Sequence, residues 1–426
     1  MDIALEFYRA EQAEKPDIPL DGPTDYLVRT PSGGVENYTL DWAEWQERIA
    51  ALDVRTTSPG ALREIGTRLR EALRGLRLSA AEADIVAASR REQPVIITIK
   101  SAAAEIARLP WELWVVKPTG QHLAELENVL LRYALPSAPA FARATAPEQP
   151  GRVVVAYAGD VAAAEHIAAV EEASHGLSFE RDRDVIARLS PRRLREALDR
   201  AQEQNAPISV LHLLCHGTLQ PDRTCALVWA GDSDDGREVM VDGADLARIL
   251  GNHAEQVRLV VLSACHSANA GTLGNLLGSV AQELHRHGIE TVIASRLALS
   301  MDGSVVFARH FYRALVAERT SVEQAFLAAR RELALDHQGL DWARLQFFAQ
   351  PRGDATTGTW PLGEPPRDGQ VSARSEDAPG PAAPARPPAR PSARAGADIE
   401  DRDGATPAPT FDALMARHQR VEGGRR

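Results

Sequence analysis

Two short apolar segments of the sequence lead to residues that can perform nucleophilic chemistry. Residues 259–262 lead through small residues to Cys265, and residues 208–214 lead to His216 and Gly217. Short apolar runs rich in β-branched residues are typical of buried parallel strands. Open α/β sheets carry their sites at the carboxyl ends of such strands, and a thiolate nucleophile needs a nearby base. The sequence therefore predicts a Cys–His nucleophile pair at the edge of a sheet.

Gly217 adds a possible oxyanion site to this pair. A glycine lets its N–H group approach a substrate closely, so the N–H groups of Gly217 and Cys265 are candidates to bind a developing oxyanion. Taken alone, Cys265 also fits a small buried structural cysteine. A structural role is the interpretation that we favour for Cys215 and Cys225.

The other histidines are weaker candidates. His212 lies four residues before His216, on the same side of the predicted strand, and we expect it to be a core residue. His266 follows the thiol directly, and successive residues of an extended segment point to opposite faces, so it is the poorer base. His285 and His287 lie two apart on a predicted helix and do not face each other, so no metal site is predicted.

Asp302 has two possible roles. It follows a predicted strand at residues 291–294, where its carboxylate would line a substrate pocket and favour a basic residue before the scissile bond. It also fits the N-cap of a helix that begins at Gly303, which is the interpretation that we favour. The sequence contains no G-x-x-x-x-G-K-[ST] motif, so a phosphate-binding loop of that type is not supported.

Alternating strands and helices surround these residues. The pattern predicts parallel βαβ units, and hence an α/β, three-layer αβα fold with a mostly parallel central sheet. The predicted strands are residues 94–99, 130–135, 152–158, 208–214, 226–229, 259–262 and 291–294, and the helices are residues 162–175, 191–198, 242–250, 276–287, 303–318 and 321–335.

Composition divides the chain into three regions. Residues 1–92 are predicted to form a small α+β N-terminal accessory region, with a hairpin at 25–40 and helices at 41–52 and 59–73. Residues 93–352 hold the main domain. Residues 353–426 are rich in Pro, Ala and Arg and are predicted to be a disordered C-terminal tail. The tail closes with a short apolar patch, Phe411, Leu414 and Met415, which is either an inert end or a segment that docks on a sensor or in the cleft.

Bulk properties exclude several classes of protein. The net charge of −11 over 426 residues argues against nucleic acid or an anionic membrane as the main partner. No apolar run approaches the roughly 20 residues of a spanning helix, and the N-terminus lacks the pattern of a secretory signal. The 3 cysteines are too few for a disulfide framework. We therefore expect a protein of the reducing cytoplasm.

An ordered set of motifs resembles the CHAT domain, a bacterial branch of the caspase-like (clan CD) cysteine peptidases. The set spans about residues 94–348. It consists of residues 109–114 (LPWELW), 210–217 (VLHLLCHG), 259–268 (LVVLSACHSA), 302–312 and 321–333 (SVEQAFLAARREL). The chain departs from the family pattern at Cys215, where a small residue is common, and in lacking a recognisable helical-repeat array.

The resemblance implies a dyad in which His216 is the base and Cys265 the nucleophile. It implies hydrolysis through a thioester, with no metal, no organic cofactor and no fixed third catalytic residue. It further implies a regulated endopeptidase that cleaves a protein partner encoded nearby, after an upstream sensor responds, in a bacterial defence or conflict pathway. Two alternatives stay open: a catalytically silent scaffold that acts by binding, and a flavodoxin-like protein. The lack of a Gly-rich loop after residues 152–158 weighs against the second.

Overall fold

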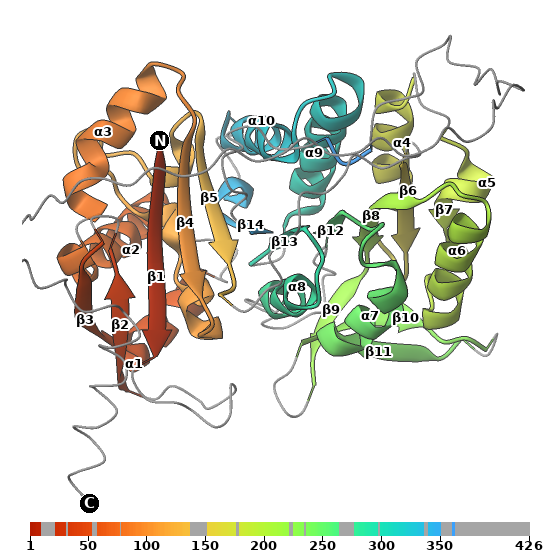
Figure 1. The fold of residues 1–426 in the computed structure, drawn as a ribbon, viewed down its shortest axis with the longest axis horizontal. Coiled ribbons are helices and arrows are strands. Elements are labelled where there is room, and N and C mark those ends of the chain that lie inside the picture. Colours follow the sequence, from red (N-terminus) through yellow and green to blue (C-terminus); the bar gives the residue numbers. More distant parts are fainter. Residues whose placement is uncertain are drawn as a thin grey trace, which may run out of the picture. The chain divides into compact units, whose positions relative to one another are not determined.

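The computed structural model describes most of the chain up to residue 362 (Figure 1). Met1–Pro366 form one compact unit. The predicted tail, with Phe411, Leu414 and Met415, lies outside the described residues except for 360–362. The described residues are 1–9, 22–30, 33–52, 58–76, 78–136, 151–175, 179–220, 225–233, 236–263, 277–296, 299–335, 340–350 and 360–362.

An eleven-stranded sheet forms the centre of the unit. The pairings β1–β2, β2–β3 and β13–β14 are antiparallel, and the other pairings are parallel. In spatial order the strands are β3 (Val35–Asp41), β2 (Pro23–Arg29), β1 (Asp2–Arg9), β4 (Val95–Ser101), β5 (Val129–Ala134), β14 (Leu345–Ala349), β13 (Thr291–Ser295), β12 (Leu259–Ser263), β8 (Ile208–Leu214), β6 (Arg152–Tyr157) and β7 (Val185–Ile186).

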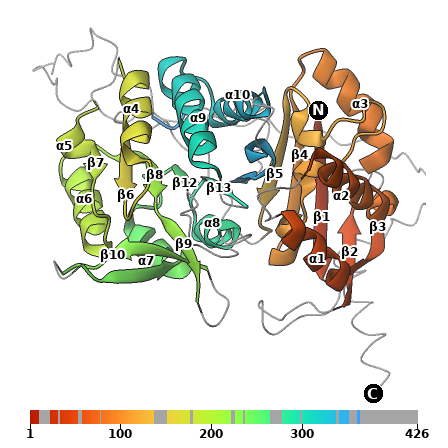
Figure 2. The same cartoon turned by 180° about the vertical axis from the view of Figure 1, so that it is seen from behind.

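Helices cover both faces of the parallel part of this sheet, which confirms the predicted three-layer fold. One layer contains α4 (Ala163–Ala173), α9 (Met301–Tyr312) and α10 (Val322–Leu335), and α9 contacts both of its neighbours. The opposite layer contains α6 (Pro191–Glu203), α7 (Gly243–Leu250) and α8 (Leu277–Arg286). Figures 1 and 2 view the molecule from opposite sides, and in both α4, α9 and α10 lie above the central strands while α7 and α8 lie below them.

The sequence explains why these elements form. All seven residues of β8 are buried, as expected of a strand that is covered on both faces. Helix α6 begins after Ser190, whose side chain accepts a hydrogen bond from the Arg193 backbone N–H, and it buries Leu194 and Leu198 on one face. In β8 and α6, the apolar pattern that predicted the element is therefore the pattern that packs it.

The N-terminal region joins the large sheet, because β1 pairs in parallel with β4. Its helices are α1 (Trp42–Leu52), α2 (Pro59–Ala72) and α3 (Leu78–Arg90). The buried Glu105 carboxylate accepts a hydrogen bond from the Tyr26 hydroxyl at 2.7 Å and pairs with Arg9. Residues 1–9 and 95–105 are thus tied together, while the predicted boundary at residue 92 stays a prediction.

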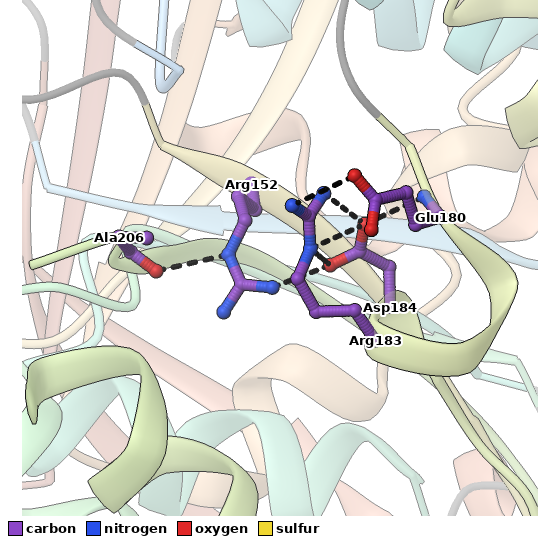
Figure 3. A network of polar contacts seen from close by, with 5 residues as sticks. All are labelled: Arg152, Glu180, Arg183, Asp184 and Ala206. Carbon is purple, nitrogen blue, oxygen red and sulfur yellow. Dashed lines mark hydrogen bonds and ion pairs between the residues drawn. The ribbon is translucent and has the colours of Figure 1, made fainter. Parts of the chain in front are cut away.

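A buried carboxylate holds the far edge of the sheet in place (Figure 3). Asp184, at the end of the short helix α5 (Arg181–Asp184), is 1% exposed. It accepts hydrogen bonds from Arg152 at 2.6 Å, from Arg183 at 2.7 Å and from the Glu180 backbone N–H at 2.9 Å. The Arg152 guanidinium also donates to the Ala206 carbonyl at 2.9 Å. Arg152, at the start of β6, is therefore hydrogen-bonded both to Asp184, just before β7, and to Ala206, just before β8.

Candidate active site

The ends of two neighbouring strands position the predicted dyad. Strands β8 and β12 are adjacent and parallel, and Leu214 pairs with Ser263 at their carboxyl ends. His216 follows Leu214 by two residues, and in the sequence Cys265 follows Ser263 by two residues. Cys265 lies outside the described residues, so its predicted place beside His216 stays a prediction.

His216 begins a second, smaller sheet at this edge. It is the first residue of β9 (His216–Leu219), which pairs with β10 (Cys225–Ala230), and β10 pairs with β11 (Glu238–Asp242). His216 and Gly217 are both half-buried. The base candidate is thus reachable from solvent, whereas the preceding strand β8 is fully buried. The role of Gly217 as an oxyanion donor stays a prediction.

The loop after β6 borders the imidazole of His216. Gly159 lies in this loop with a φ of +78°, and a Cβ atom built on it would lie 3.0 Å from His216 Cδ2 and 3.3 Å from Nε2. The sequence did not single out Gly159, because nothing in the local pattern indicates what lies against it.

The two described cysteines fit the structural role predicted for them. Cys215 and Cys225 are both buried. Burial raises the pKa of the Cys225 thiol to about 12, with a smaller contribution from Cys215. A thiol with a raised pKa is a poor nucleophile at neutral pH.

His212 belongs to a buried polar cluster under the site. Its Nδ1 forms a hydrogen bond with the Tyr312 hydroxyl at 2.7 Å, and its ring meets the His166 ring edge-on with the centroids 5.0 Å apart. His166 Nε2 lies 3.2 Å from the Ser304 hydroxyl. The prediction that His212 is a core residue is confirmed, and His166 is the partner that sequence reasoning missed.

His285 and His287 point to different surroundings. His285 is fully buried, and its Nδ1 hydrogen-bonds with the Ile289 carbonyl at 3.0 Å. His287 directly follows α8, is exposed, and forms a hydrogen bond with the Glu283 carbonyl of that helix. Within the described part of the chain, no three His, Cys, Asp or Glu side chains are grouped so that they could hold a metal ion. In the same part of the chain, no helix has the length and apolar character needed to cross a membrane.

We expect the protein to lose stability in acid because of its buried histidines. Burial lowers the pKa of His166 and His285 from 6.5 to about 4, and that of His212 well below its ordinary value. Below pH 6.5 these groups bind protons in the unfolded chain but stay neutral in the folded protein. The free energy of unfolding therefore falls by up to about 1.4 kcal/mol per pH unit for each histidine, and the dependence ends near the folded pKa.

Urea unfolding at pH 7.5, 6 and 5 measures this loss. The His166→Gln variant should lose less stability between pH 7.5 and 5 than the unchanged protein, because one titrating group is gone. An equal loss in both proteins would contradict the assignment of His166.

Asp302 is not the N-cap of its helix, so that prediction is wrong. Helix α9 begins at Met301 and its N-cap is Ser300, whose hydroxyl accepts a hydrogen bond from the Gly303 N–H at 2.9 Å. The Asp341 carboxylate fixes Ser300 by accepting from its N–H at 3.1 Å and from its hydroxyl at 2.5 Å. Asp302 sits exposed in the first turn of α9. Its role in a substrate pocket stays a prediction.

The LPWELW segment packs the centre of the sheet and carries a buried ion pair. Trp111 and Trp114 are fully buried. Between them, the Glu112 carboxylate accepts hydrogen bonds from Arg296 at 2.7 Å and from the Tyr133 hydroxyl at 2.6 Å. Arg296 directly follows β13. The segment therefore packs in the core, as predicted. Through Arg296 it also anchors the carboxyl end of β13.

Comparison with known proteins places this arrangement in a family. A family model for the CHAT domain matches residues 63–352, more than half of the chain. One solved structure of a protease is 12% identical, covers 63% of this chain and 67% of its own, and has a TM-score of 0.38; it carries no functional argument. A comparison with curated proteins found no match. The motif resemblance is thus confirmed, and the chain belongs to the CHAT family of caspase-like peptidases.

Proposed function

We propose that the chain is a regulated cysteine endopeptidase in which His216 is the base and Cys265 the nucleophile. The observation that carries this proposal is the register of β8 and β12. Leu214 and Ser263 are paired, and His216 and Cys265 each follow by two residues. Neighbouring strands lie about 4.8 Å apart, so we expect the segments that follow these paired strand ends to bring His216 and Cys265 within reach of proton transfer.

The proposed reaction has two steps. In the first, His216 takes the Cys265 thiol proton, the sulfur attacks the scissile carbonyl carbon, and the leaving amine receives the proton as the C–N bond breaks. This step leaves a thioester on Cys265. In the second, a water gives a proton to His216 and attacks the thioester carbon, the C–S bond breaks, and His216 returns the proton to the departing thiolate. The acid product then loses its own proton to solvent and leaves as the carboxylate. No metal or organic cofactor is needed.

Backbone donors would stabilise the tetrahedral intermediate of each step. We assign this role to the N–H groups of Gly217 and Cys265, because both flank the position of the attacked carbonyl in the proposed geometry. Each donor of this kind contributes a few kcal/mol to the transition state.

The substrate in this proposal is a protein partner encoded nearby, cleaved after an upstream sensor responds, within a bacterial defence or conflict pathway. Family membership supports this role by analogy. We place the protein in a reducing cytoplasm, because its 3 cysteines are too few for a disulfide framework.

A cleavage assay tests the function. We expect the protein to cleave one of the proteins encoded beside it, with the fragments identified by mass spectrometry, and Cys265→Ala to abolish the cleavage. Cys225→Ala is the matched control, because it removes a buried thiol outside the proposed dyad and should leave cleavage intact.

Two results would contradict the proposal. Cleavage by Cys265→Ala at the unchanged rate would remove the thiol from the mechanism. Stable binding of a neighbouring protein without cleavage, once the trigger is supplied, would favour the silent scaffold instead.

A further inference from the structure

We propose that Gly159 is a positioning residue for the His216 imidazole. The Cδ2–Nε2 edge of the ring faces the Cα atom of Gly159 so closely that a Cβ atom there would lie 3.0 Å from Cδ2 and 3.3 Å from Nε2. Distances of 3.0–3.4 Å are tighter than nine in ten of the contacts that real Cβ atoms make, so the ring would have to shift by a few tenths of an ångström. Because only hydrogen occupies that position, the ring lies directly against the backbone of the loop.

Hydrogen bonds hold the two residues that precede Gly159 in place. Tyr157 pairs with Leu214 at the end of β6, and the Ala158 N–H donates to the Leu214 carbonyl at 2.9 Å. The Leu189 N–H also donates to the Tyr157 carbonyl at 2.7 Å. Leu214 precedes His216 by two residues, so the loop and the histidine are fixed to the same strand end. We therefore expect a side chain at position 159 to shift the ring by a few tenths of an ångström.

Gly159 differs from other glycines with the same backbone conformation. Gly33 has a φ of +81° and Gly236 a φ of +73°, and a Cβ atom on either would meet nothing within 4 Å. All three positions disfavour a side chain through backbone strain, but only Gly159 has a ring against it. Gly159 is exposed, so core packing does not explain the close approach.

This inference rests on the proposed function, since it gives Gly159 a role through the proposed base. A general base works only when it is held in the correct geometry, and misplacement by about 1 Å costs on the order of 10²-fold in rate. A shift of a few tenths of an ångström should therefore lower the reactivity of the Cys265 thiol, which depends on the thiolate fraction that the base sustains.

Alkylation of Cys265 by iodoacetamide at pH 7 measures this effect without a substrate. The modified peptide is quantified by mass spectrometry, which separates Cys265 from the buried Cys215 and Cys225. We expect Gly159→Ala to alkylate about 10-fold more slowly than the unchanged protein. Gly33→Ala is the matched control, because Gly33 has the same strained backbone at the opposite edge of the sheet and should leave the rate unchanged.

A double-mutant cycle with His216→Ala distinguishes positioning from a general effect on the fold. Once the ring is absent, adding Gly159→Ala should change the alkylation rate no further. Equal rates in Gly159→Ala and Gly33→Ala would overturn the inference, and so would an additive loss in the double variant. If His216→Ala itself alkylates at the unchanged rate, the proposed dyad fails, and the role of Gly159 fails with it.

Discussion

Replacing His216 by alanine is expected to slow peptide-bond cleavage by about 10²–10⁴-fold, the range for loss of a general acid–base group. The fold should be unaffected, because His216 is half-buried at the end of β8 and contributes no large apolar surface to the core. Cleavage of the partner by wild type and variant at equal concentration measures the loss, and thermal unfolding checks the fold.

His212→Gln is the matched control on the same strand. His212 is fully buried and hydrogen-bonded to Tyr312, so its loss should lower stability. Cleavage measured at a temperature where the variant is folded should stay near the unchanged rate. If the His216 and His212 variants lose activity equally, the special role of His216 is contradicted.

Replacing Glu112 by alanine is expected to lower the free energy of unfolding by about 3–5 kcal/mol, because it breaks a buried ion pair and leaves one charge uncompensated. The side chains of Arg296 and Glu112 are each 2% exposed. Without the carboxylate, the guanidinium of Arg296 and the hydroxyl of Tyr133 lose their shared partner. Urea unfolding gives the difference directly.

An exposed ion pair supplies the control. The Glu127 Oε1 atom lies 3.6 Å from Arg331 Nη2, and both side chains are mostly exposed. Glu127→Ala should therefore lower the free energy of unfolding by no more than about 1 kcal/mol. Replacing Glu112 by Leu together with Arg296 by Met should recover much of the loss, since apolar groups of similar volume often substitute for a buried pair. If Glu112→Ala were as stable as Glu127→Ala, the ion pair between Glu112 and Arg296 would not stabilise the LPWELW segment.

The sequence predicts the central strands because their signals are local. Strands β6, β8, β12 and β13 are continuous apolar runs, and the structure buries them on both faces. Strand β14 is equally buried, yet it was not predicted. Its place between β5 and β13 depends on pairing with distant segments, which local periodicity does not report.

The N-terminal strand and the small sheet were missed for different reasons. Strand β1 shows the alternation of a half-buried strand, with Ile3, Leu5 and Phe7 buried, so the signal was present in the sequence. Strand β9 has only four residues. Its pairing with β10 has no signal in so short a segment, and only β10 was predicted there.

The sequence predicts those site residues that directly follow a recognisable strand, but not the contacts between distant segments. The place of His216 follows from the end of β8, whereas its contact with Gly159 and the meeting of His166 with His212 join segments far apart in the chain. The start of α9 had a local signal, since Ser300 is a good N-cap with Gly303 three residues later. Only Asp302 was predicted as the cap, although Ser300 lies two residues earlier and its hydroxyl caps the helix.

The central claim, that His216 activates Cys265, is tested most directly by the pH dependence of Cys265 alkylation in the wild type and in His216→Ala. A dyad keeps the thiol reactive well below the ordinary cysteine pKa of about 8.5, so the wild type should react rapidly at pH 6–7 and His216→Ala only as the pH rises toward that value. Coincident profiles in the two proteins, both following an ordinary thiol, would contradict the claim.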